Sequence, residues 1–383
     1  MNIDYPLAHN NWGYDEEQAI ARVMKSGRYT MGNEVKAFED RFCEITGSKY
    51  AVMVNSGSSA NLLIAAAMQR LHRFDRVILP RIGWSTTYAP WMQHGFDLLI
   101  LDVDETLNIN PDLVNEHYVD GQDLVMPVNL LGNPCDFDRL PKFMVEDNCE
   151  SFGATYKDKW TGTFGMAASY SFFFSHHLST MEGGMIVTDD PEIYKCLLPL
   201  RAHGWTRELE RSDFTQSEAI DGWKNSYTFT LPGYCVRPLE MSGATGREQL
   251  KRHRYFLERR SANAHVFKEL FGKSEICDIQ AISPNSTRHS WFGFAIILKG
   301  RLKGKRQEVV TRLGAFGVET RPVVTGDILK QPMMSHYEYW TCPDQGLTMT
   351  ERVEEDGFFI GNDDRDLTDK LQQVYEVIDG IEN

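Results

Sequence analysis

Two adjacent histidines, His176 and His177, stand in a loop between a strand-like run that includes Ser171 and the triplet Glu182-Gly183-Gly184. A histidine with a pKa near its ordinary value can take up and release a proton at neutral pH, so the pair is a candidate for acid–base catalysis. The simpler alternative is that both rings are polar surface residues or hydrogen-bonded residues of the core. Sequence neighbours rarely share one metal ion, so the pair alone does not predict a zinc site.

The segment Asn55-Ser56-Gly57-Ser58-Ser59 joins a predicted buried strand to a predicted helix. Small side chains let a ligand approach the backbone, and the free amides at a helix start attract anions. The serine hydroxyls add donors, so the segment predicts a phosphate site. A capped helix start with a glycine turn explains the same residues equally well. No Gly-Lys-Ser/Thr follows, which excludes a Walker-type loop.

Carboxylates follow another predicted strand, residues 143–146, where Asp147 and Glu150 stand close together. Open parallel sheets bind ligands at the carboxyl ends of their strands. A carboxylate there can hold the protonated ring nitrogen of a cofactor and so keep the ring electron-deficient. Asp147 could instead cap a helix, and the two interpretations are compatible.

Short apolar strands alternate with helices over the first two thirds of the chain. Several strands are apolar throughout, which predicts an α/β fold with a mixed, mostly parallel sheet covered on both faces. The pattern changes near residue 248, so we expect a large ligand-binding domain at 1–247 and a small C-terminal α/β domain at 248–383. The predicted strands are 51–54, 77–79, 98–102, 124–127, 143–146, 169–173, 185–188 and 291–298, and the predicted helices are 16–26, 33–45, 60–71, 248–270, 305–314 and 367–378.

The net charge of −14 argues against a nucleic acid or an anionic membrane as partner, because both need a basic face. No apolar run approaches the ~20 residues of a membrane span, and the first residues lack the pattern of a secretion signal. We therefore expect a cytoplasmic protein. The seven cysteines are scattered without a C-x-x-C pair, which predicts reduced thiols and neither a zinc site nor an iron–sulfur cluster.

Taken in order, these motifs resemble those of the DegT/DnrJ/EryC1/StrS family of sugar aminotransferases and dehydratases, over nearly the whole chain. The resemblance implies an aspartate aminotransferase-like fold (fold type I), pyridoxal 5′-phosphate as cofactor, bound by the large domain, and a homodimer. Further matching stretches are Gly32-Asn-Glu-Val35, Leu231-Pro-Gly-Tyr-Cys-Val-Arg-Pro-Leu-Glu240, Ser290-Trp-Phe-Gly-Phe294 and Glu319-Thr-Arg-Pro-Val-Val-Thr-Gly326.

In most members of that family a lysine at the position of His176 binds the cofactor covalently. No lysine lies between Lys159 and Lys195 here, and an imidazole cannot form that bond but can move a proton. The stretch around His176 is similar to the histidine-bearing 3-dehydratases of the family, which act on nucleotide-linked 4-keto-6-deoxy sugars. We therefore expect deoxygenation at C3 of such a sugar, with pyridoxal and pyridoxamine phosphate as cofactor forms, glutamate as amino donor and His176 as acid and base.

The resemblance also implies which residues hold the cofactor. Asp147 would bind the ring nitrogen, and Glu150 would lie near the ring hydroxyl. Trp84 would stack on the ring, with ordinary core packing as the alternative. The residues expected to hold the phosphate are Gly57, Ser58 and Ser171.

Three further residues are candidates for the substrate pocket. Arg207 would pair with the carboxylate of the amino donor, with a surface ion pair as the alternative; the other two are His289 and Arg321. The chain departs from the family at Cys235, where an asparagine usually reaches the phosphate of the neighbouring subunit. It also lacks the tight cysteine cluster of the iron–sulfur dehydratases.

Two other functions remain open at this point. A 4-aminotransferase that works without the lysine would leave nitrogen on the sugar, whereas a dehydratase would release ammonia. A binding or regulatory protein that lost its activity would also lack the lysine. The retained residues Asp147, Glu150, Ser171 and Glu182 favour an enzyme.

Overall fold

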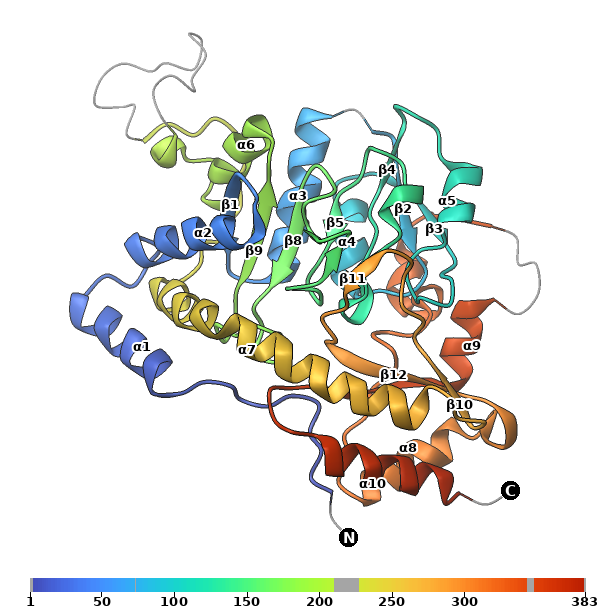
Figure 1. Ribbon diagram of the computed structural model, residues 1–383. Helices are drawn as coiled ribbons and strands as arrows, with labels where there is room; N and C mark the ends of the chain where they lie inside the picture. Colours follow the sequence, from blue (N-terminus) through green and yellow to red (C-terminus); the bar gives the residue numbers. More distant parts are fainter. Residues whose placement is uncertain (1–2, 73, 210–226, 343–347, 382–383) are drawn as a thin grey trace.

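The computed structural model describes residues 3–72, 74–209, 227–342 and 348–381 (Figure 1). The strands of its central sheet are β1 (Tyr50–Val54), β2 (Arg76–Pro80), β3 (Asp97–Leu101), β4 (Asp123–Val125), β5 (Glu146–Asp147), β8 (Ala168–Ser171), β9 (Gly184–Thr188) and β13 (Trp340–Thr341). They form two runs, β1-β9-β8-β5 and β13-β3-β2-β4, which single bridges join at Val125–Met144 and Val128–Asp147. Only β9 is antiparallel to its neighbours, which confirms the predicted mixed, mostly parallel sheet.

Alternate residues of the strands enter two different cores, so the fold has three layers. Val52 and Val54 of β1 pack with α3 (Gly57–Leu71), α4 (Ser85–Gln93) and α6 (Pro191–Arg201). Ala51 and Met53, between them in sequence, pack with α2 (Asn33–Thr46) on the other face. A period of two with both faces apolar is what a strand covered on both sides requires.

The C-terminal part of the chain has its own core. The antiparallel strands β10 (Cys277–Ile279), β12 (Gly293–Leu298) and β14 (Gly357–Gly361) form its sheet. Around this sheet lie α8 (Arg306–Ala315), α9 (Met349–Asp356) and α10 (Thr368–Asp379). A separate small sheet joins β11 (Ser286–Arg288) to the hairpin β6 (Thr155–Tyr156) and β7 (Lys159–Trp160). The remaining elements are α1 (Tyr14–Ser26), α5 (Pro111–His117) and the short 3₁₀ helices η1 (Leu130–Gly132), η2 (Phe137–Arg139), η3 (Thr206–Glu208), η6 (Gly300–Leu302), η7 (Ile328–Lys330) and η8 (Pro332–His336).

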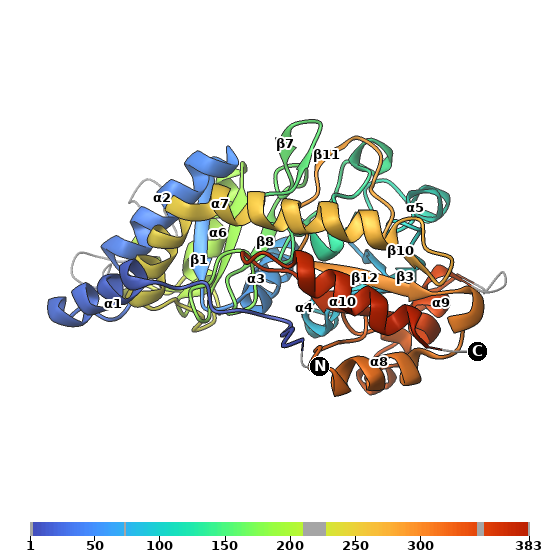
Figure 2. The same cartoon turned by 60° about the horizontal axis from the view of Figure 1, so that its bottom comes forward.

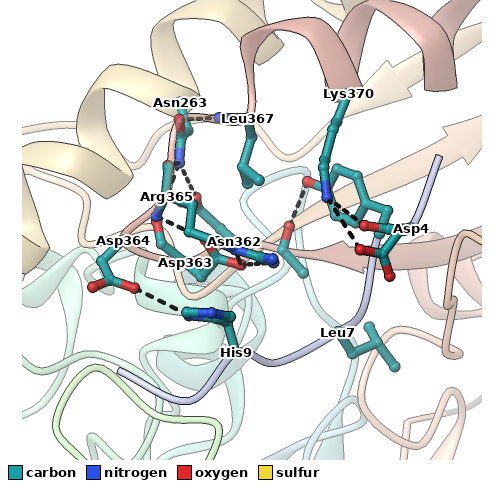
Figure 3. Close-up of polar contacts among 12 residues, drawn as sticks. Asp4, Leu7, His9, Asn263, Asn362, Asp363, Asp364, Arg365, Leu367 and Lys370 are labelled. Atoms are coloured by element: carbon teal, nitrogen blue, oxygen red, sulfur yellow. Dashed lines mark hydrogen bonds and ion pairs between the residues drawn. The ribbon is translucent and has the colours of Figure 1, made fainter. Parts of the chain in front are cut away.

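One long helix, α7 (Glu240–Phe271), crosses both parts of the molecule (Figures 1 and 2). The predicted boundary between residues 247 and 248 falls inside this helix. The start of the chain packs with the C-terminal part, where the Tyr5 hydroxyl donates to the Gly361 carbonyl at 2.7 Å. Farther along, His9 Nδ1 lies 3.6 Å from an Asp364 carboxylate oxygen (Figure 3).

Within the described ranges, no helix is both long enough and apolar enough to cross a bilayer. The same residues contain no group of three or more histidine, cysteine, aspartate or glutamate side chains placed to hold a metal ion.

Candidate active site

The sequence predicts ten site residues: His176 as acid and base, six that hold the cofactor and three in the substrate pocket. Eight of these ten line one cavity of about 390 Å³. The cavity lies where the carboxyl ends of β5 and β8 meet the start of α3, as expected for an open parallel sheet. Its volume falls in the range of small-molecule sites, roughly 300–1,000 Å³. The eight residues are Gly57, Ser58, Trp84, Asp147, Glu150, Ser171, His176 and Arg321.

The first turn of α3 forms an anion cradle. Ser56 caps this helix, because its Oγ accepts a hydrogen bond from the Ser59 amide at 3.1 Å. The amides of Gly57 and Ser58 donate to no other described residue, so both can bind an anion at the positive end of the helix. A Cβ at Gly57 would come within 2.7 Å of Ser171 Cβ, so only glycine fits between the helix and β8.

Asp147 is a buried carboxylate surrounded by neutral donors. Its Oδ2 accepts hydrogen bonds from Asn61 Nδ2 at 3.0 Å and from Thr87 Oγ1 at 2.8 Å. Its Oδ1 accepts from the Cys149 amide at 3.2 Å and from Ser169 Oγ at 3.4 Å. No ion pair joins Asp147 to a cationic side chain among the described residues. A protonated ring nitrogen in the cavity would therefore supply the missing positive charge.

Glu150 lies beside Asp147 in the wall of the cavity. One of its carboxylate oxygens accepts a hydrogen bond from the Leu131 amide at 2.9 Å. Burial raises the pKa of Glu150 to about 7; the Leu131 amide opposes this shift and the Asp147 carboxylate adds to it. Near neutral pH the carboxyl group can therefore donate a hydrogen bond as well as accept one.

The ring of His176 is held by the backbone, with Nδ1 2.8 Å from the carbonyl oxygen of Cys149. A carbonyl can only accept, so Nδ1 carries the proton. Burial lowers the pKa of His176 to about 4; the Cys149 hydrogen bond opposes the shift and the Arg260 guanidinium adds to it. The ring is therefore neutral at pH 7, and its lone pair is on Nε2, the nitrogen available to a ligand in the cavity.

The second histidine has a different place. His177 is 1% exposed and its Nε2 donates to the Ser290 carbonyl at 2.9 Å. It does not line the 390 Å³ cavity. The two histidines therefore differ in their surroundings. The acid–base interpretation fits His176, whereas the alternative of a hydrogen-bonded core residue fits His177.

Trp84 and Arg321 lie at the cavity on separate elements. Trp84 is 53% exposed directly before α4, so core packing does not explain it, and its ring is free to cover a ligand. Arg321 is anchored through its backbone, which pairs with Phe359. Among the described residues, it is the one lysine or arginine that lines the cavity.

Two predicted site residues do not line this cavity. The Arg207 guanidinium lies over the Trp205 ring, 5.1 Å from its centroid. The buried His289 ring stacks on Trp291 at 3.7 Å and accepts a hydrogen bond from the Trp291 amide at 3.0 Å. Packing on a neighbouring tryptophan therefore takes both side chains away from the cavity. Cys235 is exposed and also lies outside it.

Other residues of the site were not expected from the sequence. Asn61 and Thr87 orient Asp147, and the Cys149 carbonyl orients His176. Thr87 stands in the same stretch as Trp84, and Asn61 follows the cradle by one helical turn. Their places beside these motifs could therefore have predicted that both line the site. A backbone carbonyl leaves no signal in a sequence.

Replacing Gly57 by alanine should weaken binding of pyridoxal phosphate by roughly tenfold, because a methyl group there collides with Ser171 and Cys149. A titration followed by cofactor absorbance measures this. Gly314→Ala is the matched control, since nothing lies within 4 Å of a Cβ at that position. Equal affinity in both variants would show that the first turn of α3 is not the cofactor cradle.

Replacing Glu150 by glutamine should remove an ionisation near pH 7 from the bound cofactor's absorbance. The pKa of Glu150 is raised to about 7, so its carboxyl gains charge between pH 6 and pH 8, whereas glutamine stays neutral. The measurement is a pH titration of the absorbance of both cofactor-loaded proteins. A midpoint that persists in the variant would assign the ionisation to another group.

The chain matches the model of the DegT/DnrJ/EryC1/StrS aminotransferase family over residues 11–379. It is 44% identical over 390 residues to a GDP-4-keto-6-deoxy-D-mannose 3-dehydratase of Yersinia pseudotuberculosis, covering 98% of this chain and 98% of that protein. A solved GDP-4-keto-6-deoxymannose-3-dehydratase with a trapped PLP-glutamate geminal diamine matches with a TM-score of 0.91 at 42% identity, over 98% of this chain and 100% of that one. A variant of that enzyme with bound GDP-perosamine also matches with a TM-score of 0.91 at 42% identity, over 98% of this chain and 100% of that one. The chain therefore belongs to the DegT/DnrJ/EryC1/StrS family and has its aspartate aminotransferase-like fold.

Proposed function

We propose that this chain is a pyridoxal phosphate-dependent lyase that removes the C3 hydroxyl of GDP-4-keto-6-deoxymannose, with glutamate as amino donor. The observation that carries the proposal is the neutral His176 ring, fixed through Nδ1 in the wall of the cavity. The Yersinia relative, similar over nearly its whole length, bears the name of this activity.

His176 decides between elimination and transamination. No lysine lines the cavity in the part of the chain that the structure describes. A lysine would favour return of a proton to the sugar carbon, and hence an amino sugar as product. Imidazole Nε2 can accept a proton and give it up again, but it forms no lasting covalent bond to the cofactor. Its presence therefore favours loss of the hydroxyl group and release of nitrogen as ammonia.

The cavity fits pyridoxal phosphate. When bound, this cofactor supplies an electron sink and, in its amine form, carries nitrogen from an amino donor to a ketone. The amides of Gly57 and Ser58, with the Ser171 hydroxyl, would hold its phosphate. Asp147 would hold the ring nitrogen, and the exposed face of Trp84 would cover the ring.

The substrate groups are assigned by charge. Arg321, with its planar guanidinium, would bind the carboxylate of glutamate. Glutamate as donor is supported by the PLP-glutamate structure of the relative, and a GDP-linked sugar by the complex with GDP-perosamine. Arg207 and His289 are left out of this assignment because neither lines the cavity.

We also propose that the enzyme is a homodimer whose subunits meet at the mouth of the cavity. Trp84 and Phe173 line the cavity and are 53% and 41% exposed. Phe174 and Met181 are similarly exposed on the same loop. Exposed apolar side chains grouped in this way mark protein interfaces.

Light scattering of the cofactor-loaded protein should give twice the chain mass. The Phe174→Glu variant should shift this mass toward that of the monomer, because it places a charge in the interface. A monomeric wild-type protein would contradict the proposal.

The reaction is tested by incubating the protein with pyridoxal phosphate, glutamate and GDP-4-keto-6-deoxymannose, and analysing the products by mass spectrometry. We expect a 3-deoxy-4-keto sugar, 2-oxoglutarate from the glutamate, and ammonia. His176→Asn should retain cofactor absorbance but lose turnover by roughly 10²–10⁴-fold, the usual contribution of a positioned acid–base group. His94→Asn, at a histidine that does not line the cavity, should behave like the wild type.

Each alternative gives a different result. A product that keeps nitrogen on the sugar would make the enzyme an aminotransferase. Failure to bind pyridoxal phosphate at all would support a binding or regulatory protein. Full turnover by the His176→Asn variant would remove this histidine from the mechanism.

A further inference from the structure

A second cavity, of about 320 Å³, lies beside α7 and shares no lining residue with the cavity of His176. No aspartate or glutamate lines it in the described part of the chain. Its polar lining residues include Ser261, His265, Lys268, Ser286, Arg288 and His289. The chain has 54 acidic against 40 basic residues, yet the described lining of this cavity contains cationic side chains and no carboxylate.

Arg288 is the main unexplained charge in this cavity. It stands at the end of β11, in the small sheet beside α7 (Figures 1 and 2), and its side chain is only partly exposed. Its Nε donates to the Gly153 carbonyl, and its guanidinium lies 5.3 Å from the centroid of the Trp160 ring. Its two terminal nitrogens donate to no described residue. Burial lowers the pKa of Arg288, and no carboxylate opposes the shift.

Three other partly or fully buried arginines have the ion pair that Arg288 lacks, whereas the buried Arg260 donates to the Trp291 and Phe292 carbonyls instead. Arg76, Arg81 and Arg201 each pair with a carboxylate, at 2.7 Å in all three cases. A charge removed from water without a counter-ion is costly. No ion pair links Arg288 to a carboxylate among the described residues, so its charge is available to a bound anion.

Further donors surround the same space. Lys268, on the exposed side of α7, has no carboxylate partner among the described residues, and its ammonium lies 5.9 Å from the Trp291 ring. The Ser286 hydroxyl oxygen is buried and has no hydrogen-bond partner within the described chain. The Ser261 hydroxyl completes the set. A planar guanidinium, an ammonium and two hydroxyls form a donor set suited to a tetrahedral oxyanion.

We propose that this cavity binds a phosphate group, held by Arg288 and Lys268 with the hydroxyls of Ser261 and Ser286. A neighbouring groove of about 740 Å³ shares Ser261 and Arg288 and adds Arg254, so the rest of a phosphorylated small molecule can continue along α7. Two carboxylates, Glu44 and Glu258, also line this groove, so the phosphate would lie at the Lys268 end, in the cavity without a carboxylate. The phosphate can belong to a nucleotide or be free phosphate, since both offer the same oxygens.

The test is isothermal titration of the cofactor-loaded protein with inorganic phosphate, and separately with GDP, at constant ionic strength. Loading the cofactor first occupies the phosphate cradle of α3. We expect Arg288→Gln to weaken phosphate binding by about tenfold or more, as loss of a charge-assisted contact does. Arg139→Gln is the matched control, because this exposed arginine pairs with Asp112 on another part of the surface. Dehydratase activity and cofactor absorbance should stay unchanged in both variants.

Unchanged phosphate affinity in Arg288→Gln, or no phosphate binding by the wild type, overturns the proposal. Should Arg288→Gln fail to fold, Lys268→Gln changes an exposed side chain and is expected to show the same loss. GDP affinity above that of phosphate, with the gain abolished by Arg254→Gln, identifies a nucleotide; equal affinities identify free phosphate. Phosphate binding and turnover are separate readouts, so failure of the proposed dehydratase activity would not be mistaken for failure of this site.

Discussion

A hydrogen bond of 2.8 Å joins His176 Nδ1 to the carbonyl oxygen of Cys149, two residues after the buried Asp147. The bond fixes which ring nitrogen carries the proton, and so makes Nε2 the proton acceptor. It also ties the loop after β8 to the end of β5. The proposed base, His176, and the carboxylate that would hold the cofactor ring are therefore positioned by one short stretch of backbone. The same hydrogen bond could not orient a lysine at position 176 in this way, because a lysine side chain is flexible and has no ring.

The sheet explains why residues far apart in sequence share this site. β5 and β8 are parallel neighbours, with Asp147 opposite Ser169, so Asp147 and Ser171 emerge at one edge. The start of α3 approaches the same edge closely enough that Gly57 has no room for a Cβ. The start of α3, the Asp147 carboxylate and the His176 imidazole thus lie around one cavity, and mostly short side chains and the backbone position them. Such a rigid arrangement suits a cofactor held without a covalent bond.

Much of the fold around the cavity could be predicted from the sequence, because apolar runs mark several strands of the central sheet. The runs at 51–54, 77–79 and 185–188 lie inside β1, β2 and β9. The short strands β6, β7 and β11 carry polar residues and left no such run. The places of Arg207 and His289 depend on stacking against Trp205 and Trp291, which no local pattern reveals. The orienting carbonyl of Cys149 was equally hidden, because any residue supplies a carbonyl.

The most direct measurement asks whether the resting protein is covalently joined to its cofactor. The cofactor-loaded protein is treated with borohydride, which makes any bond between a lysine and pyridoxal phosphate permanent, and the intact chain is then weighed. We predict the mass of the unmodified chain, with the cofactor recovered free. A chain heavier by one cofactor, with the added mass on a lysine, would contradict the role assigned to His176.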